Sequence, residues 1–291
     1  MRHWLTAIRP KTLWAAVAPV LVGTAFAVRD GLADAMWAVA ALAAAILLQV
    51  ATNLHNDWAD ARHGADSGDR RGPERVTQAG LLSPTRVLFA ALCAFFLAAL
   101  VGVAGTVRAG WPIAAVAAAS VVAGLSYTGG SRPLGYRGLG DVLVLLFFGP
   151  VAVAGTYYVQ ALQLTTATVL AGLGPGLLAT AVLVLNNIRD RTQDLAAGKQ
   201  TLAVRLGPRF GRWEYVGCVV FGSLAPTVVL ASAGLRPWHL LPLVALAPAL
   251  ALIKVVAQGA DGGELNPLLA RTAQLLLLSA LATAAAAIVT A

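Results

Sequence analysis

Long apolar stretches separated by short polar segments recur along the whole 291-residue chain. Each stretch is close to the ~20 residues that a helix needs to cross the hydrocarbon core of a membrane. A spanning backbone must satisfy its own hydrogen bonds, and the sequence lacks the alternating pattern of barrel strands, so we expect helices. The pattern predicts nine transmembrane helices, at 13–28, 36–54, 85–107, 112–128, 139–159, 167–188, 214–233, 238–257 and 267–290.

Composition points to the same class of protein. Hydrophobic residues make up 58% of the chain and charged residues only 12%, whereas an ordinary soluble domain carries roughly 25% charged residues. Because so few charges cannot cover a water-exposed surface, most of the chain is expected to face lipid. No soluble domain fits between the spans. We therefore expect an all-α, polytopic membrane protein that forms a single domain, 1–291.

Basic residues are distributed unevenly about the predicted spans. A net charge of +8 would also suit a nucleic-acid-binding protein, so the placement of the 21 Lys and Arg matters more than their sum. Only Arg29, Arg108 and Arg236 fall on one side of the predicted membrane. Because Lys and Arg concentrate in cytoplasmic segments, the N-terminus and the segments after spans 2, 4, 6 and 8 are predicted to be cytoplasmic. We expect membrane lipid, and no nucleic acid, as a partner.

Two Asp-rich cytoplasmic segments hold more than half of the 13 acidic residues. Both begin at the predicted end of a span, so helical spacing applies to each start. Asn56 and Asp60 are four residues apart, as are Asp190 and Asp194, and each pair therefore shares one helix face. The first segment contains Asn53, Asn56, Asp57, Asp60, Asp66, Asp69 and Glu74, and the second contains Asn186, Asn187, Asp190 and Asp194.

These columns of oxygen atoms suit a metal ion. Like charges at four-residue spacing repel each other, which indicates a cation between them. Mg²⁺ fits, because it prefers carboxylate oxygens and completes its shell with water and phosphates. The alternative is that the acids form ordinary surface ion pairs with the Arg residues beside them. The candidate metal ligands are Asn56, Asp57, Asp60, Asn187, Asp190 and Asp194.

Basic residues interleaved with the acids would suit a diphosphate, which needs cationic hydrogen-bond donors in addition to a metal. For each of them, the topological role of keeping a segment in the cytoplasm is an equally good interpretation. The candidates are Arg9, Lys11, Arg70, Arg75, Lys199 and Arg205. A separate group of glycines, Gly172, Gly174 and Gly176, lies inside a span, so it predicts a closely packed or flexible helix rather than a nucleotide-binding loop.

The two Asp-rich segments resemble those of the UbiA superfamily of intramembrane aromatic prenyltransferases, whose members share nine helices. Asn56, Asp57 and Asp60 match the first family motif, Asn-Asp-x-x-Asp, with Asp66 as its further acid. Asp190 and Asp194 match the second motif, Asp-x-x-x-Asp. The superfamily often places its next acid four residues after Asp60, where this chain has Gly64.

Further stretches are similar to the branch of that superfamily that prenylates 1,4-dihydroxy-2-naphthoate in menaquinone biosynthesis. They include Arg9-Pro-Lys-Thr-Leu13, Tyr127-Thr-Gly-Gly130, Pro133-Leu-Gly-Tyr136 and the segment from Gly198 to Gly207. The resemblance implies Mg²⁺-dependent transfer of a polyprenyl group from polyprenyl diphosphate to that naphthoate, with loss of CO₂ and diphosphate. It also implies a multi-pass protein of the bacterial inner membrane with its active site on the cytoplasmic side.

The resemblance gives some residues a role in this reaction. The catalytic acids would be Asp60, Asp66, Asp190 and Asp194, and Asp141 would help to deprotonate the acceptor. Tyr127, Arg132 and Tyr136 would bind the aromatic substrate. Other interpretations remain open, since Tyr residues anchor at membrane interfaces and an acid at a helix start is often a simple cap.

Two competing functions also remain open. The first keeps prenyl transfer and changes the acceptor, for example to 4-hydroxybenzoate, homogentisate, a haem or another lipid. The second is a membrane transporter, although the acids lie at helix ends rather than near the midplane, where transporters bind their substrates.

Overall fold

The computed structural model describes residues 2–62, 72, 75–232 and 234–290, and all regular structure in these residues is helical. The elements in chain order are α1 (Arg2–Ile8), η1 (Pro10–Thr12), α2 (Leu13–Arg29), α3 (Ala35–Arg62), α4 (Pro84–Ala109), α5 (Trp111–Thr128), η2 (Gly135–Arg137), α6 (Gly140–Phe147), α7 (Pro150–Ala161), α8 (Thr166–Ala171), α9 (Leu173–Ala196), α10 (Leu202–Ala231), η3 (Pro237–Ala245), α11 (Leu246–Ala257), η4 (Gly262–Glu264) and α12 (Leu265–Val289).

Within these ranges, nine helical segments are long and apolar enough to cross a membrane, which confirms the predicted fold class. Two of these segments are longer than predicted. The second and sixth spans continue beyond the apolar stretch, to Arg62 and Ala196. The polar residues expected at the start of two loops therefore lie on the last turns of α3 and α9.

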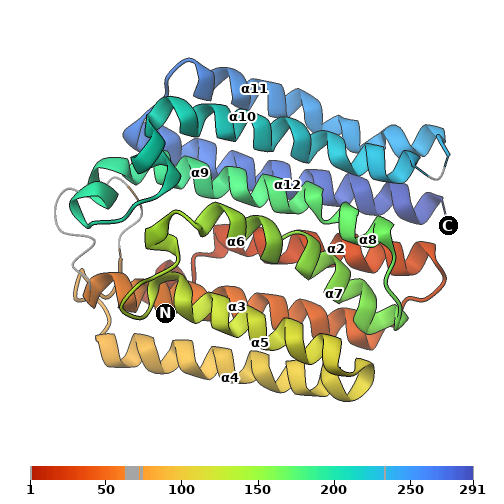
Figure 1. Cartoon of the computed structure of the whole chain (residues 1–291), viewed down its shortest axis with the longest axis horizontal. Helices are drawn as coiled ribbons and strands as arrows, with labels where there is room; N and C mark the ends of the chain where they lie inside the picture. The colour runs from red at the N-terminus through yellow and green to blue at the C-terminus, as the bar shows by residue number, and fades with distance from the viewer. Residues whose placement is uncertain (1, 63–71, 73–74, 233, 291) are drawn as a thin grey trace.

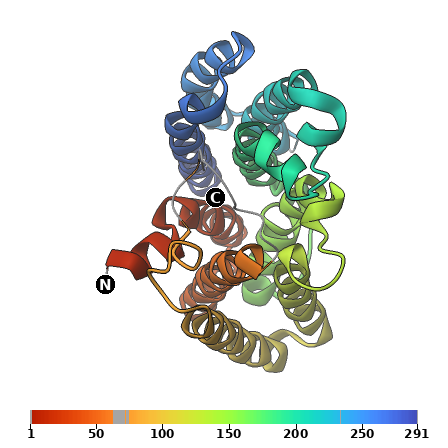
Figure 2. The ribbon, with the colours of Figure 1, turned by 90° about the vertical axis from the view of Figure 1, so that its left-hand side faces the viewer.

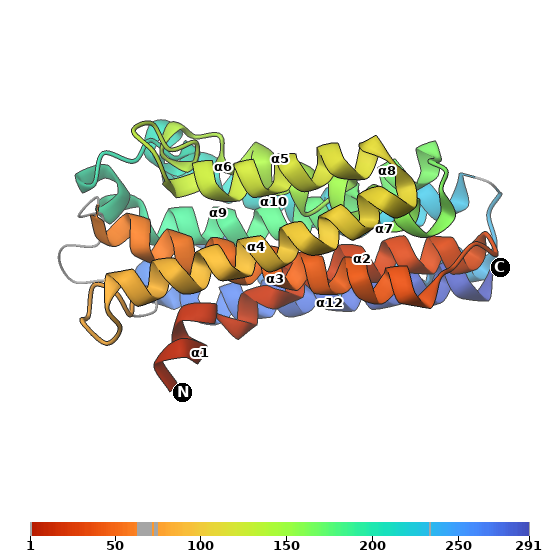
Figure 3. The same cartoon turned by 90° about the horizontal axis from the view of Figure 1, so that it is seen from below.

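The long helices pack side by side with their axes roughly aligned (Figure 1). Seen from one end, they follow one another around the bundle in chain order, from red α2 to blue α12 (Figure 2). The short helix α1 projects from the bundle beside the N-terminus (Figure 3). The ends of α3 and α9 that carry the Asp-rich motifs lie at the same end of the bundle, on the left of Figure 1.

Large apolar side chains are found both in the bundle interior and on its outer surface. Phe26, Tyr157 and Leu178 are fully buried in the main core, which joins α2, α7, α9, α10 and α12. In contrast, Phe89 and Phe96 on α4 are well exposed. An apolar outer surface of this kind suits a helix bundle whose solvent is lipid.

Two of the spans are broken where glycines bring backbones together. The fifth divides into α6 and α7 beside Gly149, and the sixth divides into α8 and α9 at Gly172. A Cβ atom added to Gly172 would lie 2.5 Å from the Cα of Pro150, and one added to Gly176 would lie 2.6 Å from the carbonyl oxygen of Leu145. The glycines therefore permit close helix contact, as small residues do in membranes.

The close contact of Gly176 with Leu145 predicts an effect on stability. Replacement of Gly176 by Ala should lower the free energy of unfolding by about 1–3 kcal/mol, because the new methyl group overpacks the junction of α6 and α9. Thermal unfolding in detergent measures the effect. Gly217→Ala is the control, since its added Cβ meets nothing within 4 Å. Equal unfolding temperatures for the two variants would contradict the importance of this contact.

Candidate active site

The motif-bearing ends of α3 and α9 face a shared cavity of about 420 Å³. Its polar end brings together side chains that are far apart in the sequence. The polar groups that line it include Arg9, Asn56, Asp60, Arg75, Tyr127, Thr128, Tyr136, Asn186, Asn187, Asp190, Gln193, Asp194 and Lys199. Both predicted oxygen columns thus contribute to one site.

On α3, hydroxyl groups from α5 and η2 orient the two metal-ligand candidates. The Thr128 hydroxyl donates to Oδ1 of Asn56 at 2.7 Å. The Tyr136 hydroxyl donates to Oδ1 of Asp60 at 2.6 Å, and the Arg75 guanidinium donates to the other oxygen of that carboxylate. Asp60 is only 1% exposed, and it is stabilised as a carboxylate because every contact offers it a proton donor or a positive charge.

Lys199 lies between the two motifs. Its Nζ atom is 3.3 Å from Oδ1 of Asp60 and 3.7 Å from Oδ1 of Asp194. The same ammonium group lies over the ring of Tyr136, 4.8 Å from its centroid. One cation therefore bridges carboxylates on α3 and α9, which would otherwise repel each other across the cavity.

On α9, the second motif is held by a buried arginine. The Arg189 guanidinium donates from Nε and Nη2 to the two oxygens of Asp190, each at 2.7 Å. Asn187 faces a different neighbour, since its Nδ2 donates to Oδ1 of Asp141 at 3.4 Å. Asp141 is buried but does not line the cavity, so its contact with the site is indirect.

Asp57 points away from its neighbour Asn56. It does not line the cavity, and its Oδ1 accepts a 3.0 Å hydrogen bond from the backbone N–H of Thr77. Asp57 is 1% exposed, so it fastens the segment that follows Arg75 to α3. This contact separates it from Asn56 and Asp60, with which the sequence grouped it.

The other predicted residues divide into two sets. Arg9, Arg75, Tyr127, Tyr136 and Lys199 line the cavity. The structure places three basic residues on the exposed surface, away from the cavity lining: Lys11, Arg132 and Arg205. Two further predicted residues, Asp66 and Arg70, lie outside the described residues.

Sequence reasoning did not identify Thr128 or Arg189 as parts of the site. Thr128 lies in the Tyr127-to-Gly130 stretch, and Arg189 directly precedes Asp190. Both positions adjoin residues that were singled out, so proximity to a motif was the available signal. Their contacts depend on helices that meet only in the folded chain.

The donor atoms fit a magnesium ion, although the acids are paired with basic side chains. Among the described residues, no group of three His, Cys, Asp or Glu side chains lies ready to hold a metal. The available set instead mixes carboxylates with the side-chain amides of Asn56 and Asn186, and all of them line one cavity. Oxygen ligands of this kind, completed by substrate phosphates, are what Mg²⁺ prefers.

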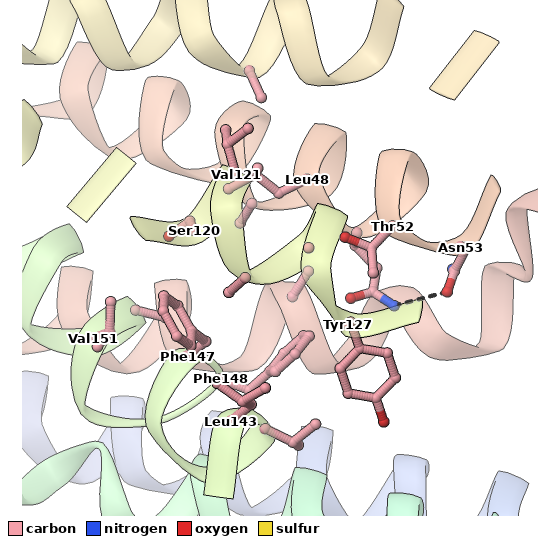
Figure 4. Close-up of a pocket in the computed structure, with 18 of the residues that line it drawn as sticks. Leu48, Thr52, Asn53, Ser120, Val121, Tyr127, Leu143, Phe147, Phe148 and Val151 are labelled. Carbon is pink, nitrogen blue, oxygen red and sulfur yellow. Dashed lines mark hydrogen bonds between the residues drawn. The ribbon is translucent and has the colours of Figure 1, made fainter. Parts of the chain in front are cut away.

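Away from the charged end, the cavity becomes apolar. Leu48 and Val121 lie on one side, and Leu143, Phe147 and Phe148 lie on the other (Figure 4). The lining continues along α3 and α4 as far as Trp37 and Gly105. We call this part of the cavity the apolar arm. It can hold a hydrocarbon chain whose charged head lies beside the Asp-rich motifs.

The chain is similar over nearly its whole length to known proteins. Residues 16–261 match the model of the UbiA prenyltransferase family. The 1,4-dihydroxy-2-naphthoate octaprenyltransferase of Mycobacterium tuberculosis is 42% identical, over 98% of this chain and 96% of that protein. The enzyme of the same name from Escherichia coli is 39% identical, over 95% and 92% of the two chains.

The fold also has a solved counterpart. The structure of a UbiA homologue from Archaeoglobus fulgidus, bound to GPP and Mg²⁺, superposes with a TM-score of 0.71. The alignment covers 99% of each chain at 16% sequence identity. At this identity, the likeness establishes the arrangement of the helices.

The contact of Asp57 predicts that this acid stabilises the fold. Asp57→Ala should lower the free energy of unfolding by about 1–3 kcal/mol, because a buried N–H group loses its acceptor. Asp57→Asn keeps an acceptor oxygen and should unfold close to the wild-type temperature. Thermal unfolding and Mn²⁺ binding in detergent measure both variants. A folded Asp57→Asn protein that has lost Mn²⁺ binding would contradict the structural role.

Proposed function

Because the chain belongs to the UbiA prenyltransferase family, we propose that it transfers a polyprenyl group from polyprenyl diphosphate to 1,4-dihydroxy-2-naphthoate, with loss of diphosphate and CO₂. The observation that carries this proposal is the near full-length similarity to the 1,4-dihydroxy-2-naphthoate octaprenyltransferases of Mycobacterium tuberculosis and Escherichia coli. The cavity supports it independently, because a charged end and an apolar arm match the two halves of a prenyl diphosphate.

In this proposal, the charged end binds the diphosphate and a magnesium ion. Asn56, Asp60, Asp190 and Asp194 would hold the metal. When bound, Mg²⁺ neutralises the diphosphate and so makes it a better leaving group. Lys199 bridges two of these carboxylates, and its ammonium group would turn to the diphosphate once the metal takes over their charge.

Among the described basic residues that the sequence singled out, only Arg9, Arg75 and Lys199 line the cavity. We therefore assign diphosphate binding to these three. Guanidinium and ammonium groups stabilise the charge that develops on the leaving oxygen as its bond to carbon breaks.

The apolar arm would hold the isoprenoid chain and exclude water. Exclusion of water matters because an allylic cation forms when the carbon–oxygen bond to the diphosphate breaks, and water would consume it. The small residues Ala41, Ala44 and Ala45 of α3 leave room for the chain along one wall.

The aromatic acceptor would lie between the two parts of the cavity, beside Tyr127 and Tyr136. Its ring carbon that bears the carboxylate attacks the allylic cation, and a new carbon–carbon bond forms. The bond from that carbon to the carboxylate then breaks, and its electron pair restores the aromatic ring as CO₂ leaves. The electron pair of the broken carbon–oxygen bond leaves with the diphosphate, and a lone pair of the carboxylate oxygen forms the second carbon–oxygen double bond of CO₂.

The nine apolar helices and the family match indicate a multi-pass membrane protein. We propose that it lies in a bacterial inner membrane with the charged end of the cavity on the cytoplasmic side. The distribution of Lys and Arg supports this orientation, because Arg29 and Arg108 lie at the opposite end of the bundle from α3's motif.

The proposed reaction predicts a specific product. Purified protein with Mg²⁺, a polyprenyl diphosphate and 1,4-dihydroxy-2-naphthoate should release CO₂ in a one-to-one ratio with prenylated product. Mass spectrometry should find the acceptor enlarged by one prenyl group and smaller by CO₂. Parallel reactions with 4-hydroxybenzoate and homogentisate serve as the comparison. Prenylation of either one, without turnover of the naphthoate, would overturn the assignment of the acceptor.

The proposed metal site predicts which acids are essential. Asp60→Asn keeps the size of the side chain and an oxygen for Tyr136, but it removes the charge that holds the metal. We expect kcat to fall more than about 100-fold. Because Arg75 and Lys199 lose a charged partner, the unfolding temperature should also fall, and activity is therefore measured at a temperature where the variant is folded. Asp34→Asn is the control, because Asp34 lies at the opposite end of the bundle and pairs with Arg108. Full activity in Asp60→Asn would refute the metal assignment.

A further inference from the structure

Arg189 lies behind the cavity wall and does not line the cavity. Its exposed fraction is only 3%, yet its guanidinium group makes hydrogen bonds in three directions. Nε and Nη2 donate to the two oxygens of Asp190. Nη2 also donates to Oδ1 of Asn186, and Nη1 donates to Oδ1 of Asn266 at 2.9 Å.

Two of these partners, Asp190 and Asn186, line the polar end of the cavity. A carboxylate has about four positions that accept hydrogen bonds. Arg189 therefore leaves lone pairs of Asp190 free to face the cavity. Because a guanidinium group is planar and rigid, it also fixes the position of one side chain relative to the other.

The third partner connects the site to the last helix. Asn266 lies in the first turn of α12, and no described residue of α12 lines the cavity. The guanidinium group is confined on another side as well, since a Cβ atom added to Gly72 would lie 2.7 Å from its Nη2 atom. Arg189 is thus held between α9, α12 and Gly72.

We propose that Arg189 and Asn266 are positioning residues, which hold Asp190 and Asn186 in the arrangement that binds a divalent cation. The last helix then sets the affinity of a site to which it contributes no ligand. This inference rests on the proposed function for the identity of the metal site. Residues that orient metal ligands typically change metal affinity by about 10–100-fold when they are replaced.

The charge and the geometry of Arg189 have opposite effects on a cation. A positive charge beside Asp190 repels the metal, so if charge were dominant, its removal would tighten binding. If position is dominant, loss of the planar fork loosens binding even when the charge is kept. Arg189→Lys keeps the charge and removes the fork, and Arg189→Met removes both.

The experiment measures Mn²⁺ binding to the purified full-length protein in detergent, with the metal alone as the probe. Electron paramagnetic resonance of the free ion gives the Kd. We expect Arg189→Lys and Arg189→Met to raise the Kd about 10–100-fold. Asn266→Leu should raise it in the same direction, whereas Asn266→Asp keeps an acceptor oxygen and should bind at least as tightly as the wild type.

Arg191→Lys is the matched control, because Arg191 lies on the same helix and does not line the cavity. Thermal unfolding of each variant separates a local effect from loss of the fold. In the prenyl transfer assay, the Mg²⁺ concentration for half-maximal rate should rise, while KM for the aromatic acceptor stays unchanged.

The outcomes separate this inference from the proposed function. If the wild type binds Mn²⁺ and folded Asn266→Leu binds it equally well, the positioning role is wrong. Tighter binding by Arg189→Met would show that charge is dominant and would also overturn it. A wild-type protein that binds no Mn²⁺ would instead refute the metal site itself, and the inference with it.

Discussion

The structure depends on the pairing of buried carboxylates with confined cations at one end of a membrane-embedded bundle. Asp60 is almost fully buried, and a charge in such a place is stable only when it is paired and hydrogen-bonded. Arg75 and Lys199 provide that pairing on one side, and Arg189 provides it for Asp190 on the other. Because Lys199 contacts acids of both motifs, the same interactions join α3 to α9 and keep the cavity between them.

The same arrangement is compatible with the proposed metal site, although its acids are paired with basic side chains. The cations reduce repulsion among Asp60, Asp190 and Asp194 without taking every oxygen lone pair. In the proposed function, a divalent ion and a diphosphate would together replace the ammonium contact of Lys199.

The sequence predicted the helical class, the number of spans and the two columns of polar side chains. Each of these depends only on residues that are close together in the sequence, through the length of an apolar stretch or a four-residue spacing. It could not decide between Asn56 and Asp57, since adjacent residues on a helix point in different directions and only the neighbouring elements show which one faces the cavity. Arg75 and Arg205 likewise have the same chemistry. One lies in the cavity wall and the other on the exposed surface because of where their segments fold. Gly172, Gly174 and Gly176 indicated a closely packed or flexible helix, but the position of the breaks at Gly149 and Gly172 depends on backbone contacts between spans.

The cavity has charge at one end and hydrocarbon along the rest, so an amphiphile fits it in one orientation only. The cavity therefore discriminates between molecules by their shape and polarity before any reaction takes place. Anionic lipids and single-chain anionic detergents have the same polarity and therefore suit the same space. A neutral detergent with a bulky sugar head lacks the negative charge that would pair with Arg9, Arg75 and Lys199, and it is the better choice for isolating the protein with its cavity free.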